Sequence, residues 1–129
     1  MTTIDELLAV ARSRLDRLSP AEAGAEVHEG ALIVDTRCAE VRAAKGTIRG
    51  SVHVPLSVLY WRLDPTSGHD DKSLSDRERR IIVMCADGYS SSLAAATLRD
   101  IGFTRATDID GGFNAWAAAG LPVERAPAE

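Results

Sequence analysis

The sequence contains only two cysteines, Cys38 and Cys85, in 129 residues. Two cysteines do not make a disulfide framework in a chain of this size. There is no Cys-x-x-Cys motif, and the three histidines are scattered, so we expect neither a metal site nor another cofactor. Each cysteine is therefore expected to be a small buried hydrophobe or a reactive thiol.

Long apolar runs and an excess of basic residues are also missing. No run approaches the roughly 18 residues that a membrane span needs, and the N-terminus has neither the basic start nor the apolar core of a signal peptide. With 15 Lys and Arg against 19 Asp and Glu, the net charge is −4. We therefore expect a cytoplasmic protein that has neither a nucleic-acid nor a membrane partner.

The hydrophobic pattern alternates between short apolar runs and helical segments. Strands are predicted at 31–34, 51–54, 80–84 and 105–109, and helices at 3–18, 20–29, 38–45, 56–63, 91–101 and 113–119. This alternation predicts an α/β fold with a parallel sheet covered on both faces. Residues 1–18 are interpreted as an N-terminal helical extension packed on a domain of residues 19–129, whose tail from 122 is expected to be loose.

The first two helices carry recognisable start signals. Thr3 and Glu6 have the spacing of a capping box, and Ile4, Leu7 and Leu8 then begin one apolar helical face. Ser19 and Pro20 are expected to start the second helix.

Cys85 lies between a buried strand and the start of a helix. Ligands bind beyond the carboxyl ends of the strands in such sheets, and a helix start with free N–H groups favours a thiolate. Gly88 allows a loop with positive φ, and Ser90 or Ser91 is expected to cap the helix. The sequence thus predicts a cup of N–H donors that holds an anion or a charged sulfur.

These residues resemble a known family. The segment from Cys85 to Ser91 resembles the active-site loop of single-domain rhodanese-like sulfurtransferases, and residues 108–116 resemble the closing signature of that family. Residues 35–55 match its first signature in part. The resemblance implies a rhodanese-like parallel five-stranded sheet with helices on both faces.

The resemblance also implies a rhodanese-type enzyme that is thiosulfate sulfurtransferase-like. Cys85 would be the catalytic residue, taking a sulfane sulfur from thiosulfate or another persulfide or thiol donor and passing it to a nucleophilic acceptor. The expected partners are a small sulfur-containing substrate and a thiol or protein acceptor. The substrate-binding loop, acting mainly through backbone N–H groups, comprises Ala86, Asp87, Gly88, Tyr89, Ser90 and Ser91.

Charged residues around this loop set expectations about the donor. Asp87 is expected to repel a dianion at the mouth. Cationic side chains from other loops are expected to compensate: Arg37, Arg49, Arg62 or Lys72. Asp35, Arg37 and Arg49 are candidate supporting residues, although Asp35 and Arg37 are expected to be mainly structural, with Arg37 spaced to pair with Glu40.

Three other functions are weighed against sulfur transfer. A phosphatase would need an arginine six positions after the cysteine, where Ser91 stands. A non-catalytic rhodanese-like binding or regulatory module is disfavoured by the retained cysteine. A thiol redox protein would use Cys38 and Cys85, but Cys38 is expected to pack inward as an ordinary buried residue.

Overall fold

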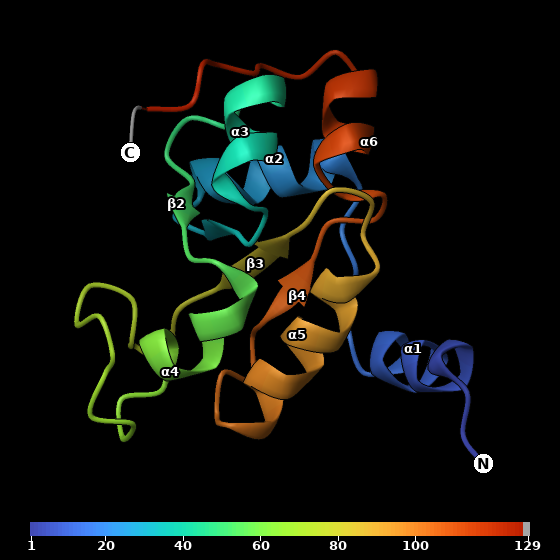
Figure 1. Cartoon of the computed structure of the whole chain (residues 1–129), viewed down its shortest axis with the longest axis vertical. Coiled ribbons are helices and arrows are strands. Elements are labelled where there is room, and N and C mark those ends of the chain that lie inside the picture. The colour runs from blue at the N-terminus through green and yellow to red at the C-terminus, as the bar shows by residue number, and fades with distance from the viewer. Residues whose placement is uncertain (128–129) are drawn as a thin grey trace.

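The computed structural model describes residues 1–127 and has a central parallel sheet with helices on both faces (Figure 1). The strand order is β2-β1-β3-β4. The strands are β1 (Leu32–Asp35), β2 (Val52–His53), β3 (Ile81–Met84) and β4 (Thr107–Asp108). The helices are α1 (Ile4–Ser13), α2 (Pro20–His28), α3 (Ala39–Lys45), the short 3₁₀ helix η1 (Leu56–Val58), α4 (Leu59–Leu63), α5 (Ser90–Asp100) and α6 (Gly112–Ala118).

The middle of the sheet is buried on both sides. Every residue of β1 and β3 is buried, as expected for parallel strands covered by helices. Alternate residues of β3 point to opposite faces, so that Ile81 and Val83 pack with α4 and α5, whereas Ile82 and Met84 pack with α2 and α6. The sheet therefore separates two hydrophobic cores, and β3 contributes to both.

The expectation of five strands was wrong, because the described residues form a four-stranded sheet. In place of a fifth strand next to β4, a single parallel bridge pairs Leu18 with Ile109. The Leu18 N–H donates to the Asp108 carbonyl at 3.0 Å, and the Asp110 N–H donates to the Leu18 carbonyl at 2.8 Å. The next residue, Ser19, already caps α2, so the pairing has no room to continue.

Helix α1 starts as predicted and ends earlier than predicted. The Thr3 hydroxyl accepts the Glu6 N–H at 3.1 Å. The helix ends at Ser13 rather than near Leu18, because Leu18 must be extended to pair with Ile109.

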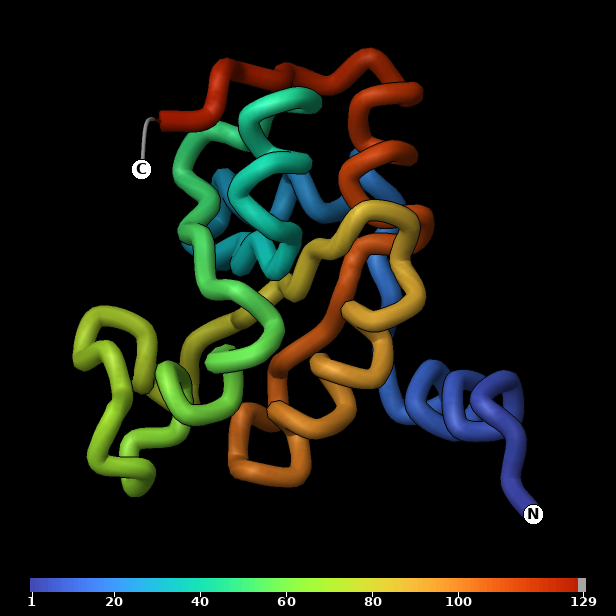
Figure 2. Tube along the Cα trace, in the orientation of Figure 1, coloured from blue at the N-terminus to red at the C-terminus, as the bar shows by residue number. Residues whose placement is uncertain are grey.

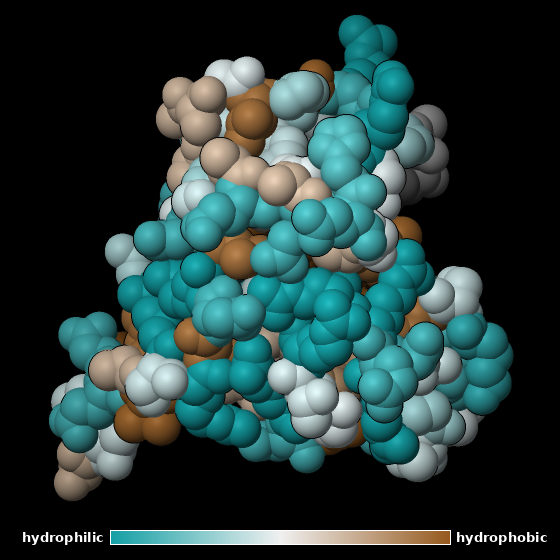
Figure 3. Space-filling view, turned by 180° about the vertical axis from the view of Figure 1, so that it is seen from behind, coloured by the Kyte–Doolittle hydropathy of each residue, from teal (hydrophilic) through white to brown (hydrophobic). Residues whose placement is uncertain are grey.

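Only part of the α1 face predicted to be apolar is buried. Helix α1 lies beside α5 (Figure 2) and buries Ala11. Ile4, Leu7 and the neighbouring Val10 are exposed, and apolar colour is visible on this protruding end of the molecule (Figure 3). The division into two parts at residue 18 stays a prediction.

The C-terminal segment is not loose over its whole length. Thr47 and Glu124 exchange two backbone hydrogen bonds of 2.8 Å, and Arg49 forms an ion pair with Glu124. The expectation of a loose tail was therefore wrong at Glu124, while its residues 128 and 129 lie outside the described part of the chain.

Candidate active site

Cys85 directly follows the carboxyl end of the central strand β3. Both neighbours of β3, the strands β1 and β4, run parallel to it, so their carboxyl ends meet at the same edge of the sheet. Figure 1 shows the connection from β3 to α5 passing over this edge, next to the start of α6. Only 8% of Cys85 is exposed, so the thiol is largely shielded from water.

The loop after Cys85 folds back onto the sulfur. The Gly88 N–H donates to Cys85 Sγ at 3.2 Å. Gly88 has φ +83, and a Cβ there would lie 2.8 Å from the Gly111 nitrogen, so only glycine fits this turn. The Gly88 N–H is thus one donor of the kind predicted for this loop.

The surroundings of the thiol favour its ionised form. Burial raises the pKa of Cys85, but hydrogen bonds from the hydroxyls of Ser91 and Ser90 and from the N–H groups of Ser91 and Gly88 lower it. The net effect is a thiol pKa below the ordinary value of 9.0. A lowered thiol pKa increases the fraction of nucleophilic thiolate near neutral pH.

Ser90 or Ser91 was expected to cap α5, but neither serine occupies the N-cap position. The N-cap position belongs to Tyr89, without a side-chain cap hydrogen bond. The hydroxyls of Ser91 and Ser92 instead donate to Asp108 Oδ2 at 2.8 and 2.7 Å. Asp108 lies at the end of β4 and is completely buried, so it fixes the first turn of α5 to the neighbouring strand.

The N-terminus of α6 packs directly against the cysteine loop. The N–H groups of Phe113 and Asn114 donate to the carbonyls of Cys85 and Ala86 at 2.9 and 3.0 Å. A Cβ on Gly112 would lie 2.5 Å from the Cys85 carbonyl oxygen, so a glycine is required for this close approach.

Asp87 lies at the exposed side of the loop. Its carboxylate accepts a hydrogen bond of 2.8 Å from Asn114 Nδ2.

Asp35 and Arg37 form a buried ion pair at the same edge of the sheet. Arg37 Nη2 lies 2.8 Å from Asp35 Oδ2, and Arg42 Nε lies 3.0 Å from the same oxygen. Burial raises the pKa of Asp35, but hydrogen bonds from Arg37 and Arg42 lower it below its usual range. The Arg37 guanidinium also lies 3.9 Å from the centroid of the Phe113 ring. Its ion-pair partner is thus Asp35, where pairing with Glu40 had been expected.

The other three cations expected to compensate for Asp87 have carboxylate partners of their own. Arg49 is paired with Glu124, Arg62 with Asp71 and Lys72 with Asp70.

Cys38 is the N-cap of α3 and is exposed, so the expectation that it packs inward was wrong. Both Cys38 and Cys85 are free thiols.

Sequence reasoning missed three residues that contact the loop or hold it. Asp108 was noted only as part of a motif, and Arg12 and Arg17 were assigned no role. The two arginines come from the N-terminal segment, and each donates to the Gly88 carbonyl, at 2.7 and 3.0 Å. Arginines near the end of a helix are common for local electrostatic reasons, so the sequence offered little signal for this contact.

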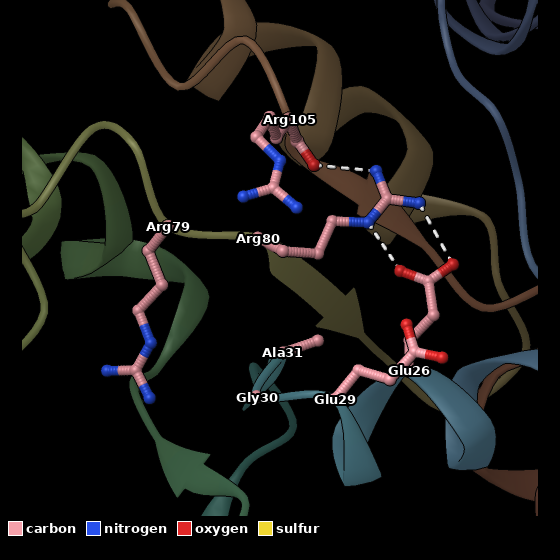
Figure 4. Close-up of a pocket in the computed structure, with 7 residues that line it drawn as sticks. All are labelled: Glu26, Glu29, Gly30, Ala31, Arg79, Arg80 and Arg105. Atoms are coloured by element: carbon pink, nitrogen blue, oxygen red, sulfur yellow. Dashed lines mark hydrogen bonds and ion pairs between the residues drawn. The ribbon is translucent and has the colours of Figure 1, made fainter.

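Two cavities in the described structure lie away from Cys85. One, of about 180 Å³, opens at the amino ends of β1 and β3, opposite the cysteine (Figure 4). Arg80 crosses it to form an ion pair with Glu26. The other, of about 150 Å³, lies beside β2 and α4.

Neither a membrane span nor a metal cluster is found within residues 1–127. No helix there combines the length and apolar character needed to cross a bilayer. No group of three His, Cys, Asp or Glu side chains is placed to hold a metal ion.

Fold and loop together define a class of protein: a parallel α/β domain in which a thiol at the carboxyl end of the central strand is surrounded by N–H and hydroxyl donors. The sequence model described as the rhodanese-like domain matches residues 19–119. The chain belongs to the rhodanese-like domain family.

Curated relatives cover most of the chain. A thiosulfate sulfurtransferase GlpE from Ectopseudomonas mendocina is 38% identical over 88% of this chain and 94% of its own length. A protein of the same name from Pseudomonas entomophila is 38% identical over 81% and 86%.

A solved structure from Rhodopseudomonas palustris is also similar. It has a TM-score of 0.89 and 32% identity, and the match covers 96% of both chains. That protein is described as one of unknown function and a possible tyrosine phosphatase. Coverage of this extent includes most of the N-terminal segment that precedes residue 19.

Proposed function

We propose that this protein is a rhodanese-type sulfurtransferase that carries a sulfane sulfur as a persulfide on Cys85. The observation that carries the proposal is a nearly buried thiol of lowered pKa whose sulfur accepts the Gly88 N–H. The relatives named thiosulfate sulfurtransferase support thiosulfate as a donor.

The reaction has two steps. The Cys85 thiolate attacks the outer sulfur of thiosulfate, a sulfur–sulfur bond forms, and sulfite leaves with the electron pair of the broken bond. A nucleophile such as cyanide or a thiolate then attacks the outer sulfur of the persulfide. The thiolate of Cys85 is restored, and thiocyanate or a new persulfide is released.

The loop stabilises the charge that moves during these steps. The outer sulfur of a persulfide carries a negative charge, and the N–H groups of residues 86–91 offer donors for it without reorganisation. Ser90 and Ser91 add hydroxyls next to the sulfur. Cys85 is largely shielded from water, so the proposed substrates are small, and the acceptor is proposed to be a small thiol or a thiol on another protein.

A phosphatase reaction fits the same site poorly. Phosphatase loops grip a tetrahedral dianion with an arginine inside the loop, whereas the chain has no arginine between Cys85 and Leu98. Arg12 and Arg17 do approach the loop, but they bond to the Gly88 carbonyl. A cytoplasmic location is proposed because free thiols such as Cys38 and Cys85 are maintained in a reducing compartment.

Intact mass spectrometry tests the proposal. The wild type, Cys85→Ser and Cys38→Ser are each incubated with thiosulfate and, separately, with 3-mercaptopyruvate. We expect the wild type and Cys38→Ser to gain one sulfur atom and to form thiocyanate from cyanide. A lack of sulfur gain from both donors would support a binding module, and a Cys38–Cys85 disulfide instead of a persulfide would support a redox protein.

A further inference from the structure

Two arginines from outside the catalytic loop converge on one atom within it. Arg12, in the last turn of α1, donates through Nη2 to the Gly88 carbonyl oxygen at 2.7 Å. Arg17, in the extended segment that follows α1, donates through its own Nη2 to the same oxygen at 3.0 Å. Gly88 also supplies the N–H that contacts the Cys85 sulfur.

The orientation of this carbonyl determines where its peptide N–H points. A trans peptide is planar, and its C=O and N–H point to opposite sides. The described residues contain no cis peptide. Holding the Gly88 carbonyl toward Arg12 and Arg17 therefore turns the Tyr89 N–H to the other side. Anchoring this carbonyl also fixes the position of Gly88, whose own N–H donates to the Cys85 sulfur, whereas a flip of the peptide would release the carbonyl oxygen from both arginines.

Each arginine has a second anchor that fixes its position. Arg12 Nε donates to Ser92 Oγ at 3.2 Å, and its guanidinium lies 5.3 Å from the centroid of the Tyr89 ring. Arg17 Nε lies 2.9 Å from Asp108 Oδ1. Both guanidinium groups are therefore held against the loop by contacts on two sides.

Arg17 is also electrostatically coupled to the sulfur. Burial lowers the pKa of Arg17, but its hydrogen bond to Asp108 and the negative charges of Asp108, Asp110 and Cys85 raise it overall. Attraction between the thiolate and the guanidinium stabilises both charged groups. The loop sequence itself contributes no cation, and its one charged residue is Asp87.

We propose that Arg12 and Arg17 are positioning residues for the sulfur-transfer reaction: they hold the Gly88 carbonyl away from Cys85 and supply the positive charge that the catalytic loop lacks. This inference rests on the proposed function for its effect on turnover. The effect of the two arginines on the Cys85 thiol pKa does not depend on any substrate.

A simpler role for these arginines would be to attach α1 to the domain. Arg14 offers a matched control, because it also lies at the end of α1 and forms an ion pair with Asp100 of α5. It makes none of the described contacts with the loop. Arg14→Gln therefore removes the same charge and one attachment of α1, while the Gly88 carbonyl keeps both of its arginine partners.

The experiment compares Arg12→Gln, Arg17→Gln and Arg14→Gln in a Cys38→Ser background. The pH dependence of alkylation by iodoacetamide gives the Cys85 thiol pKa, and steady-state assays with thiosulfate and cyanide give kcat and KM. We expect Arg12→Gln and Arg17→Gln to raise the thiol pKa and to lower kcat/KM about tenfold. Arg12→Lys and Arg17→Lys should recover part of the loss, and Arg14→Gln should match its parent.

Loss of folding is separated from loss of positioning by circular dichroism and by a second variant. Arg17→Gln leaves the buried Asp108 without its cation, so Arg17→Gln combined with Asp108→Asn removes both charges together. Arg12 has no carboxylate partner in the site, so Arg12→Gln tests the proposal without that complication. An unchanged thiol pKa and unchanged kcat/KM in folded Arg12→Gln and Arg17→Gln would overturn it, as would equal changes in Arg14→Gln.

The thiol pKa also separates this proposal from the proposed function. If the parent protein takes no sulfur from either donor but the arginine variants still shift the thiol pKa, sulfur transfer is wrong and the positioning role stands. If the parent forms a persulfide and the variants change nothing, sulfur transfer stands and the positioning role is wrong.

Discussion

The guanidinium of Arg17 lies across the carboxylate of Asp108, with Nε 2.9 Å from Oδ1 and Nη2 3.3 Å from Oδ2. This pair connects the segment before α2 to the end of β4. The same carboxylate accepts the hydroxyls of Ser91 and Ser92. Asp108 thus joins the N-terminal segment, the sheet and the first turn of α5 at one buried point.

Asp108→Asn is expected to lower the free energy of unfolding by about 2–3 kcal/mol, because it leaves a half-buried guanidinium and two hydroxyls with a weaker partner. Urea unfolding measures this change. Asp110→Asn is the matched control, since Asp110 also pairs with Arg17 but its side chain is 71% exposed. Its loss should cost less than about 1 kcal/mol. Equal losses in the two variants would contradict a special role for the buried carboxylate.

Alkylation of Cys85 should depend on pH with a midpoint below the ordinary thiol value. The folded pKa is lowered, so the thiolate is favoured in the folded state. Its contribution to stability is present above the unfolded pKa and is lost as the pH falls through the folded pKa. Measuring the iodoacetamide rate of Cys38→Ser against pH, folded and in urea, gives the two midpoints.

Ser90→Ala should move that folded midpoint upward, because the Ser90 hydroxyl is one of the groups that lower the Cys85 pKa. Ser92→Ala is the control, because the Ser92 hydroxyl donates to the Asp108 carboxylate at 2.7 Å rather than to the sulfur. We expect a smaller shift for Ser92→Ala in the same alkylation assay. A larger shift for Ser92→Ala would indicate that the orientation of the loop matters more than the Ser90 hydroxyl.

Asp87→Lys should lower KM for thiosulfate, because the change replaces an exposed negative charge in the loop by a positive one. The effect should be about threefold to tenfold at low salt and should shrink as ionic strength rises. Steady-state kinetics at two salt concentrations measure it. Asp5→Lys on α1 makes the same change of net charge on another part of the molecule. If Asp5→Lys lowers KM equally, net charge rather than the position of Asp87 is responsible.

Gly112→Ala should weaken both stability and activity, because the added Cβ would meet the Cys85 carbonyl at 2.5 Å and push α6 away from the loop. Gly120→Ala is the control, since Gly120 also has a positive φ but has nothing within 4 Å of the added Cβ. Thermal and urea unfolding should show an additional loss of about 1–3 kcal/mol for Gly112→Ala. Similar losses in both variants would mean that backbone strain alone matters there.

Local signals in the sequence were sufficient for most of the fold. Ser19 and Pro20 predicted the start of α2, where the structure has a capping box of Ser19 and Glu22. The apolar runs of β1 and β3 were predicted because strands buried on both faces need apolar residues throughout. The loop after Cys85 was also predicted from a local signal, because Gly88 allows a positive φ.

Relationships between distant segments were harder to predict. The apolar spacing of Leu15 and Leu18 continues a helical pattern, but tertiary pairing with Ile109 extends the chain there. The contacts of Arg12 and Arg17 with Gly88 join positions 76 and 71 residues apart. No local rule connects such residues, and a surface arginine looks the same in sequence whether it faces water or a catalytic loop.

The contacts of the N-terminal segment with the Cys85 loop determine where a functional fragment of this protein must begin. The family match begins at residue 19, just after Arg17. A fragment trimmed to that boundary would keep Cys85 and its loop but lose both guanidinium groups from the Gly88 carbonyl. The segment that matches the family model is therefore shorter than the segment that positions the Cys85 loop. Moving the active site to another scaffold would require α1 and the residues after it as well.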